Sequence, residues 1–274
     1  MELKDKTAIV TGSGRGIGEG VALVLGRAGA NVVVMDRNLQ DAKGVVQKIE
    51  ASGGKATPFA ADVTKKDTLD ALVAATVKQF GTVDILVNNA GIESPPALLQ
   101  DLSEQQWDRV LGVNLKGVFL CCQAVLPTMI KQNKGRIVNI GSTASIRMTF
   151  FGSLDYTVSK HGVAGLTQHL AWELADHHIT VNTVCPGGVI TPLMEEGSAP
   201  AFRDKLIQRL VPLGSFCTIE EIGETVSFLA SDRANMITGQ MLAVDGGLLT
   251  GFGEDLRAVV RQRMEAMKTG AGKH

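Results

Sequence analysis

The chain has 274 residues, of which 45% are hydrophobic and 20% are charged, and its formal net charge is −1. This is ordinary globular composition, and the near balance of charge argues against nucleic acid or an acidic membrane surface as the main partner. No apolar run approaches the ~20 residues of a membrane span, and the start of the chain lacks the apolar segment of a secretory signal, so we expect a cytoplasmic protein.

Short apolar runs alternate along the chain with segments of helical spacing. The expected strands, which end in Gly, Asn, Asp or Pro, span 7–12, 31–36, 56–62, 83–91, 135–142, 179–187 and 240–247. The expected helices include 16–29, 39–52, 65–80, 104–132, 154–176 and 218–230. Most of these strands are continuously apolar, as parallel strands covered on both faces are. Strict alternation predicts a doubly wound (Rossmann) α/β fold, with one parallel seven-stranded sheet and helices on both faces.

The first expected strand leads into a glycine-rich stretch, TGSGRGIGEG, at residues 11–20. The spacing G-x-G-x-x-G does not fit it, but Gly12, Gly16 and Gly18 fit a turn that follows a strand and opens a helix. Gly12 permits the tight turn, Gly16 lets the backbone approach a pyrophosphate, and Gly18 allows close contact between helix and strand. The N–H groups at the helix start would then face the phosphates. The alternative is a glycine-rich turn without a ligand.

Asp36 ends the second expected strand, twenty residues beyond Gly16. A carboxylate there can accept hydrogen bonds from both hydroxyls of an adenosine ribose, although it could instead cap the next helix. Arg15 and Arg37 could pair with the 2′-phosphate of NADP, but Asp36 would repel that phosphate. NAD is therefore the predicted cofactor.

Tyr156 and Lys160 lie four residues apart, and hence on one face of the helix expected over 154–176. Free tyrosine, with a pKa of ~10, is a poor base near neutrality. Lowering that pKa to ~7 takes ~4 kcal/mol of selective phenolate stabilisation, of which a lysine ammonium one turn away can supply part. Taken alone, the pair could equally be a surface tyrosine beside a solvated lysine.

Six motifs follow one another in a single order along the chain. They are the loop TGSGRGIG, NNAG at 88–91, Asn114, IGS ending at Ser142, the Tyr156-x-x-x-Lys160 pair and PGGVITP at 186–192. Together they resemble the short-chain dehydrogenase/reductase family from about residue 4 to about residue 250. The T-G-x-x-x-G-x-G loop is that family's variant of the dinucleotide turn.

The resemblance implies a role for each site residue. Tyr156 would be the general acid/base and Ser142 would hydrogen-bond the substrate oxygen. Lys160 would lower the pKa of the tyrosine and hold the nicotinamide ribose, while Asn114 would anchor a water for proton relay. The implied cofactor contacts are Gly12, Arg15, Gly16, Ile17 and Gly18 around the phosphates, Asp36, Asp62 and Val63 around the adenosine, and Asn89, Tyr156, Lys160, Val189 and Thr191 along the nicotinamide half. No metal is expected.

Two features depart from the family pattern. Serine and tyrosine are separated by fourteen residues, one more than usual, so Thr143 is an alternative to Ser142. The chain also continues well past VDGG at 244–247, where this family commonly ends. We therefore expect one domain over 1–253 with a substrate lid at about 192–212, followed by an extension over 254–274 that is helical and then disordered. That extension would form an extra surface helix or pack on a neighbouring subunit or the active-site mouth.

The segments that would wall the substrate pocket are mainly apolar, which favours a substrate with a hydrophobic body. The predicted substrate contacts are Ser142, Arg147, Phe151 and Met194. Arg147 could pair with an anionic group or point to solvent, and Glu93, just past NNAG, would border the entrance and disfavour an anion.

The main functional prediction is NAD-dependent hydride transfer between a secondary alcohol or ketone and the nicotinamide. The alternative is an NADPH-dependent 3-oxoacyl-type reductase, supported by Arg15, Arg37 and the segment GRIVNIGS. A dinucleotide sensor without catalysis is disfavoured, since a sensor has no need of Tyr156. The resemblance also implies a homo-oligomer, a dimer or tetramer paired through the helices at 104–132 and 154–176.

Overall fold

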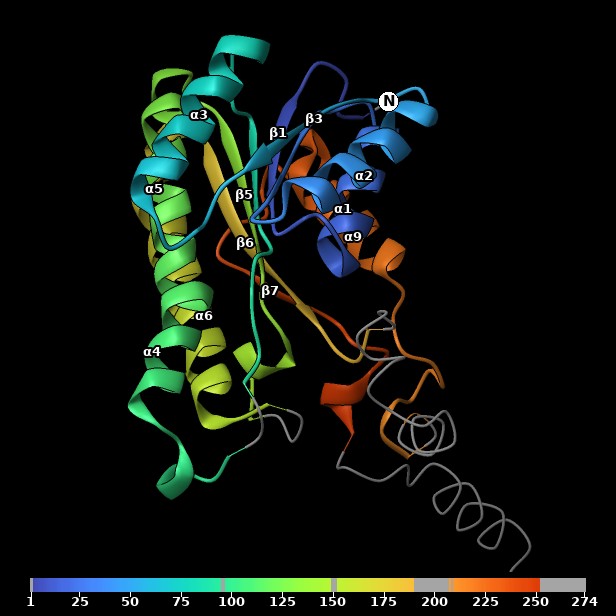
Figure 1. Ribbon diagram of the computed structural model, residues 1–274. Helices are drawn as coiled ribbons and strands as arrows, with labels where there is room; N and C mark the ends of the chain where they lie inside the picture. The colour runs from blue at the N-terminus through green and yellow to red at the C-terminus, as the bar shows by residue number, and fades with distance from the viewer. Residues whose placement is uncertain (1, 95–96, 149–151, 190–206, 208, 252–274) are drawn as a thin grey trace, which may run out of the picture.

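The computed structural model describes residues 2–94, 97–148, 152–189, 207 and 209–251 (Figure 1). Several predictions fall outside these residues. They concern Phe151, Thr191, Met194, most of the lid at 192–212 and the whole extension at 254–274.

Seven parallel strands form one sheet in the order β3-β2-β1-β4-β5-β6-β7. Their bounds are β1 Thr7–Thr11, β2 Asn31–Asp36, β3 Lys55–Ala60, β4 Ile85–Asn88, β5 Gly135–Ile140, β6 Ile179–Pro186 and β7 Met241–Val244. The chain starts at the centre, winds to one edge, returns to pair β4 with β1, and then winds to the other edge. This confirms the doubly wound fold, whose ligand crevice lies where the strand order reverses, at β1 and β4.

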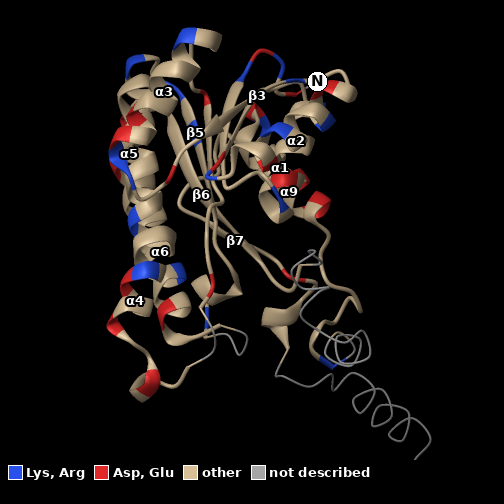
Figure 2. Ribbon diagram, in the orientation of Figure 1, with Lys and Arg blue, Asp and Glu red and all other residues tan. Residues whose placement is uncertain are grey.

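Helices cover both faces of the sheet (Figure 1). One face carries α1 (Gly16–Arg27), α2 (Leu39–Ala51) and α9 (Ile219–Ala230). The other carries α3 (Lys66–Phe80), α5 (Gly117–Lys131) and α6 (Leu154–Glu173), with α4 (Glu104–Leu111) leading into α5. Basic and acidic residues both occur among these outer helices, and α9 carries acidic residues only (Figure 2). The sheet is thus the middle of three layers.

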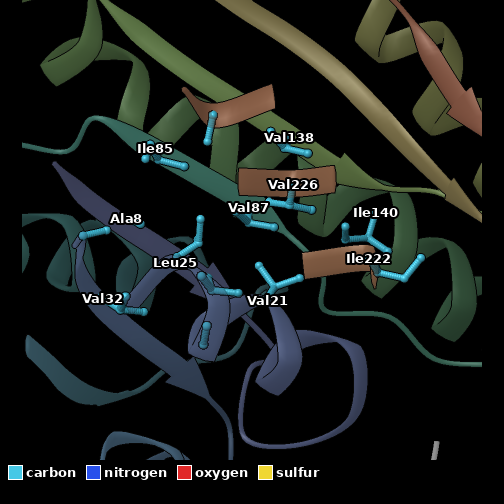
Figure 3. Packing of buried hydrophobic residues seen from close by; sticks show 14 of the residues in the cluster. Ala8, Val21, Leu25, Val32, Ile85, Val87, Val138, Ile140, Ile222 and Val226 are labelled. Atoms are coloured by element: carbon cyan, nitrogen blue, oxygen red, sulfur yellow. The ribbon is translucent and has the colours of Figure 1, made fainter. Parts of the chain in front are cut away.

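Each face of the sheet has its own hydrophobic core. Ala8 and Val10 of β1 belong to the core under α1, α2 and α9, where Val21 and Ile222 pack on the strands (Figure 3). Ile9, between them in sequence, belongs to the core under α3, α5 and α6. Because successive side chains of a strand point to opposite faces, a strand buried on both needs an unbroken apolar run. This is the physical basis of the runs seen in the sequence.

The helix expected over 104–132 has three parts. Between α4 and α5, residues Gly112–Lys116 form a π-helical turn that contains Asn114. A π turn in an α-helix is rare and is frequent at functional sites. The helical stretch predicted over 104–132 is confirmed from Glu104 to Lys131, but the π turn was not predicted, because hydrophobic spacing does not report a single extra residue in a helix.

The combined stretch Glu104–Lys131 has an 18-residue window of mean hydropathy 1.6, so by length and composition alone it could cross a membrane. The sequence analysis did not foresee this. Buried residues make up 44% of that window, and α5 packs on β4 and β5 of the sheet. A core helix of a soluble protein passes the same test, so the finding is weak support for a membrane span.

Candidate active site

The glycine loop connects β1 to α1 and lies at the crevice between β1 and β4. Gly12 and Gly16 have φ angles of 61° and 60°, a left-handed conformation that glycine adopts at little cost. A Cβ at Gly12 would lie 2.8 Å from Cα of Ala90, whereas one at Gly16 would meet nothing within 4 Å. The N-cap of α1, Arg15, makes no side-chain capping bond, so its side chain satisfies none of the free N–H groups at the helix start. This cradle fits a pyrophosphate.

Asp36, at the end of β2, lies directly beside that loop. Its Oδ2 accepts a hydrogen bond from the N–H of Gly14 at 3.0 Å, and its Oδ1 accepts one from the N–H of Asn38 at 3.0 Å. It is Asn38, and not Asp36, whose side chain caps α2, by accepting from the N–H of Gln40. The carboxylate keeps lone pairs for further donors, so it fits the hydroxyls of a ribose.

The remaining predicted positions around the loop and the adenosine follow two other strands: Asn89 follows β4, and Asp62 and Val63 follow β3. Asn89 donates from Nδ2 to the carbonyls of Thr11 and Gly12 at 3.0 and 2.9 Å, so its side chain fixes the loop. Burial would raise the pKa of Asp62, but hydrogen bonds from Thr64 and nearby positive charge outweigh it and lower that pKa. Val63 is buried and packs in the core that α5 covers.

Tyr156 lies in the first turn of α6, and Ser142 follows β5. The two side chains share a hydrogen bond, which favours the phenolate. Burial and the negative charge of Glu93 outweigh that bond and raise the pKa of Tyr156 to about 12. In the absence of a cofactor, the tyrosine is therefore fully protonated near neutral pH.

Lys160 is one turn further along α6 and is only 6% exposed. Its Nζ donates to the carbonyl of Ile140 at 2.8 Å and lies 5.6 Å from the centre of the Tyr156 ring. Burial lowers the pKa of Lys160 to about 8, partly offset by Cys185 and, to a smaller extent, by the charge of Glu93. The predicted pair is thus a half-buried tyrosine beside a buried lysine, and it is not a surface tyrosine beside a solvated lysine.

Asn114, in the π turn, is buried behind this pair. Its Nδ2 donates to the carbonyl of Ile92 at 2.9 Å and to Oγ of Ser159 at 3.2 Å, while its Oδ1 accepts from the N–H of Ile92 at 2.8 Å. Both side-chain donors are therefore used within the protein. A relay water would have to be held by an acceptor, either Oδ1 or a backbone carbonyl.

Two further predicted positions make specific contacts. Val189 is buried and forms an isolated bridge with Cys217. Arg147 is exposed, and its Nη2 donates to the carbonyl of Leu248 at 3.1 Å. Part of the donor capacity of Arg147 is therefore taken by the backbone after β7. Among the described residues, no group of three or more His, Cys, Asp or Glu side chains could hold a metal ion.

The glycine cradle, the Asp36 carboxylate and the Ser142–Tyr156–Lys160 cluster lie at the carboxyl ends of the parallel strands β1, β2 and β5. A family model described as enoyl-(acyl carrier protein) reductase matches residues 12–249. The chain belongs to the short-chain dehydrogenase/reductase family. It is accordingly an oxidoreductase that uses a nicotinamide cofactor.

Three similar members of the short-chain dehydrogenase/reductase family cover most of the chain. The 3-oxoacyl-[acyl-carrier-protein] reductase of Thermotoga maritima is 41% identical over 249 residues, 91% of this chain and 100% of that protein. The (2S)-[(R)-hydroxy(phenyl)methyl]succinyl-CoA dehydrogenase subunit BbsD of Thauera aromatica is 40% identical over 247 residues, 90% and 98% of the two chains. The crystal structure of a 3-oxoacyl-[acyl-carrier protein] reductase from Brucella melitensis superposes with a TM-score of 0.83 at 33% identity, covering 90% of this chain and 92% of that one.

Although the serine and the tyrosine are separated by one residue more than usual, it is still Ser142 that lies next to Tyr156. Ser142 bonds to Tyr156 and caps the short 3-10 helix Thr143–Ser145, whereas Thr143 is buried within that helix. We predict that Ser142→Ala lowers kcat by much more than Thr143→Ala, because only the first removes the hydroxyl that the family resemblance assigns to the substrate oxygen. Steady-state kinetics of the two variants test this, and the reverse order would assign the role to Thr143.

The sequence analysis missed the residues that hold this short-chain dehydrogenase/reductase site from behind. Ser159 links Asn114 to the carbonyl of Tyr156, and Ser94 bonds to Asp155, the residue before the tyrosine. Ser159, inside the Tyr156–Lys160 interval, could have been found by its helical spacing. Ser94 and Asp155 are 61 residues apart, and no local pattern joins them.

Proposed function

We propose that this protein interconverts 3-oxoacyl and 3-hydroxyacyl thioesters with a nicotinamide cofactor. The observation that carries the proposal is the Ser142–Tyr156–Lys160 cluster, in which the serine and tyrosine are half-buried and the lysine is buried. Two relatives support the substrate class, since one is named for reducing a 3-oxoacyl thioester and the other for dehydrogenating a hydroxyacyl-CoA. They favour the alternative of the sequence analysis over its main prediction of a general secondary alcohol dehydrogenase.

The proton chemistry of the site also supports reduction. With a pKa of about 12 in the absence of cofactor, Tyr156 carries the proton that its phenol oxygen would give to a ketone. Ser142 would hold the same substrate oxygen and stabilise the phenolate left behind, and the Lys160 ammonium would add a positive charge. The cofactor, when bound, supplies the hydride. In the oxidative direction the same groups would return the proton.

Exposed apolar side chains that follow Ser142 in the sequence fit an acyl chain. Ile146 and Met148 follow the 3-10 helix and are 44% and 60% exposed. They are the described part of the apolar lining expected from the sequence. A substrate with a hydrophobic body would cover them.

A substrate comparison tests this function. We expect a higher kcat/KM for reduction of a short 3-oxoacyl thioester than for a plain ketone of similar length, because the site would recognise the acyl carbonyl as well. Faster turnover of plain secondary alcohols than of the 3-hydroxyacyl thioester would instead restore the main prediction. The rates are followed by the absorbance of the reduced cofactor.

For the cofactor we propose NAD, on the strength of Asp36. The carboxylate is fixed by two backbone N–H groups at the position where a ribose would lie, so a 2′-phosphate would be repelled. Asp36→Ala should weaken NADH binding by about 1.5–3 kcal/mol and narrow the gap to NADPH. Fluorescence titration with both cofactors measures this. A wild-type preference for NADPH would contradict the proposal and favour the full alternative.

The structure leaves fewer apolar side chains of α5 and α6 exposed for a subunit interface than the sequence suggested. Val118, Leu120 and Val163 are buried in the chain's own core, so they are not free for a partner. Phe119 on α5 and Trp172 on α6 are 47% and 80% exposed and remain available. We keep a homodimer or homotetramer as the proposal, and light scattering at micromolar concentration tests it.

A further inference from the structure

Two residues of the segment that follows β4, Ile92 and Ser94, hydrogen-bond to residues next to the candidate active site. Ile92 uses both of its backbone groups, because its N–H donates to Oδ1 of Asn114 at 2.8 Å and its carbonyl accepts from Nδ2 at 2.9 Å. This places the backbone of residue 92 against the π turn. A Cβ built on neighbouring Gly91 would lie 3.8 Å from Nζ of Lys160, so the segment passes directly over the lysine.

The second fastening point is Ser94. Its hydroxyl lies 2.8 and 3.0 Å from the two oxygens of Asp155, which is fully buried and also accepts from Ser153 and from the N–H of Tyr156. Since Asp155 precedes the tyrosine, this bond ties residue 94 to the start of α6. Residues 92 and 94 are thus both held, and Glu93 is set between them.

The carboxylate of Glu93 acts on the reacting groups. Its charge raises the pKa of Tyr156, after burial the next largest influence, and also raises that of Lys160. Burial raises the pKa of Glu93 itself, while Lys160 lowers it. Within the described part of the chain, Glu93 makes no salt bridge or hydrogen bond with its carboxylate, so this group is available to a substrate.

We propose that Glu93 is a specificity-determining residue that rejects substrates with a carboxylate near the reacting carbon. The inference rests on the proposed function and narrows it. A 3-oxoacyl thioester is neutral beside its ketone, whereas the corresponding free 3-oxo acid carries a negative charge two carbons from it. Like charges a few ångströms apart at a protein surface change a binding constant by about tenfold or more. The enzyme therefore binds the 3-oxoacyl thioester in preference to the free 3-oxo acid.

The first test uses the fact that Tyr156 is the only tyrosine of the chain. The ultraviolet absorbance of tyrosinate therefore reports this one side chain, and a stopped-flow jump to high pH reads it before the protein unfolds. Glu93→Gln should lower the midpoint of the Tyr156 titration, and Glu50→Gln, at an exposed position on α2, should leave it unchanged. An unchanged midpoint in Glu93→Gln would overturn the proposal.

The second test compares acetoacetamide with acetoacetate, which have nearly the same shape and differ in charge. Calorimetric titration of each into the enzyme saturated with NAD forms a complex that cannot react. Wild type should bind the amide at least about tenfold more tightly, and Glu93→Gln should close most of that gap. A gap that persists in Glu93→Gln would refute the assignment. Failure to reduce 3-oxoacyl thioesters would contradict only the proposed function, because neither test depends on turnover.

Discussion

Replacing Tyr156 with phenylalanine should lower kcat by about 10²–10⁴-fold while leaving NADH binding nearly unchanged. The variant removes one oxygen atom, which is the group proposed to give and take the proton. The ring remains, so packing beside Lys160 and the bond from that lysine to the carbonyl of Ile140 should persist. Single-turnover kinetics and a fluorescence titration with NADH separate the two effects.

The control for this variant is Ser142→Ala, which leaves the phenol in place and removes its hydrogen-bond partner. It should lose activity and, in addition, raise the pKa of Tyr156 further, because the bond from Ser142 favours the phenolate. If Tyr156→Phe kept substantial activity, another group would have to carry the proton. Lys160, with a pKa of about 8, would then be the first candidate.

The pH dependence of stability follows from the same tyrosine. Its pKa is about 12 in the folded chain and about 10 when unfolded, so the folded state holds the proton more firmly. This contribution to the free energy of unfolding is fully present below about pH 10 and is lost as the pH rises toward about 12. In denaturant titrations, Tyr156→Phe should therefore lose less stability over this range than wild type does. An equal loss would assign the alkaline effect to other groups.

The fold could be predicted because its determinants are local in sequence. A strand such as β1 needs an apolar run when both its faces are covered, and its residues 8–10 are all apolar. Order along the sheet follows from the alternation of strand and helix. The π turn at Asn114 was not predicted, and the two hydrogen bonds that Asn114 makes with Ile92 join segments that are distant in sequence.

The same distinction separates the site residues that were found from those that were missed. Tyr156 and Lys160 are one helical turn apart, so their spacing carries the information. Ser94 and Asp155 meet only in the folded chain, where the segment after β4 lies against the start of α6. The sequence analysis placed Glu93 at the entrance, but its electrostatic effect on Tyr156 required the folded arrangement.

The second large effect is expected from Gly18→Ala, in the first turns of α1. A Cβ at Gly18 would lie 2.4 Å from the carbonyl oxygen of Gly12 and 2.4 Å from Nδ2 of Asn89. Neither atom can easily move away, since Asn89 is bonded to the carbonyls of Thr11 and Gly12 and thereby fixes the turn. The helix start would have to shift away from the loop. The N–H groups proposed to face the cofactor phosphates would shift with it.

We expect Gly18→Ala to cost about 1–3 kcal/mol of folding stability, as overpacking at a rigid site does, and to weaken NADH binding by more than tenfold, because about 1.4 kcal/mol of lost binding free energy is a factor of ten. The matched control is Gly44→Ala in α2, where a Cβ would meet nothing within 4 Å. That variant should stabilise the fold by about 0.5–1 kcal/mol through helix propensity and leave NADH binding unchanged. Thermal unfolding and NADH titration of both proteins decide the matter. Equal effects of the two substitutions on stability and on NADH binding would show that the close contact at Gly18 does not determine the shape of the cofactor cradle.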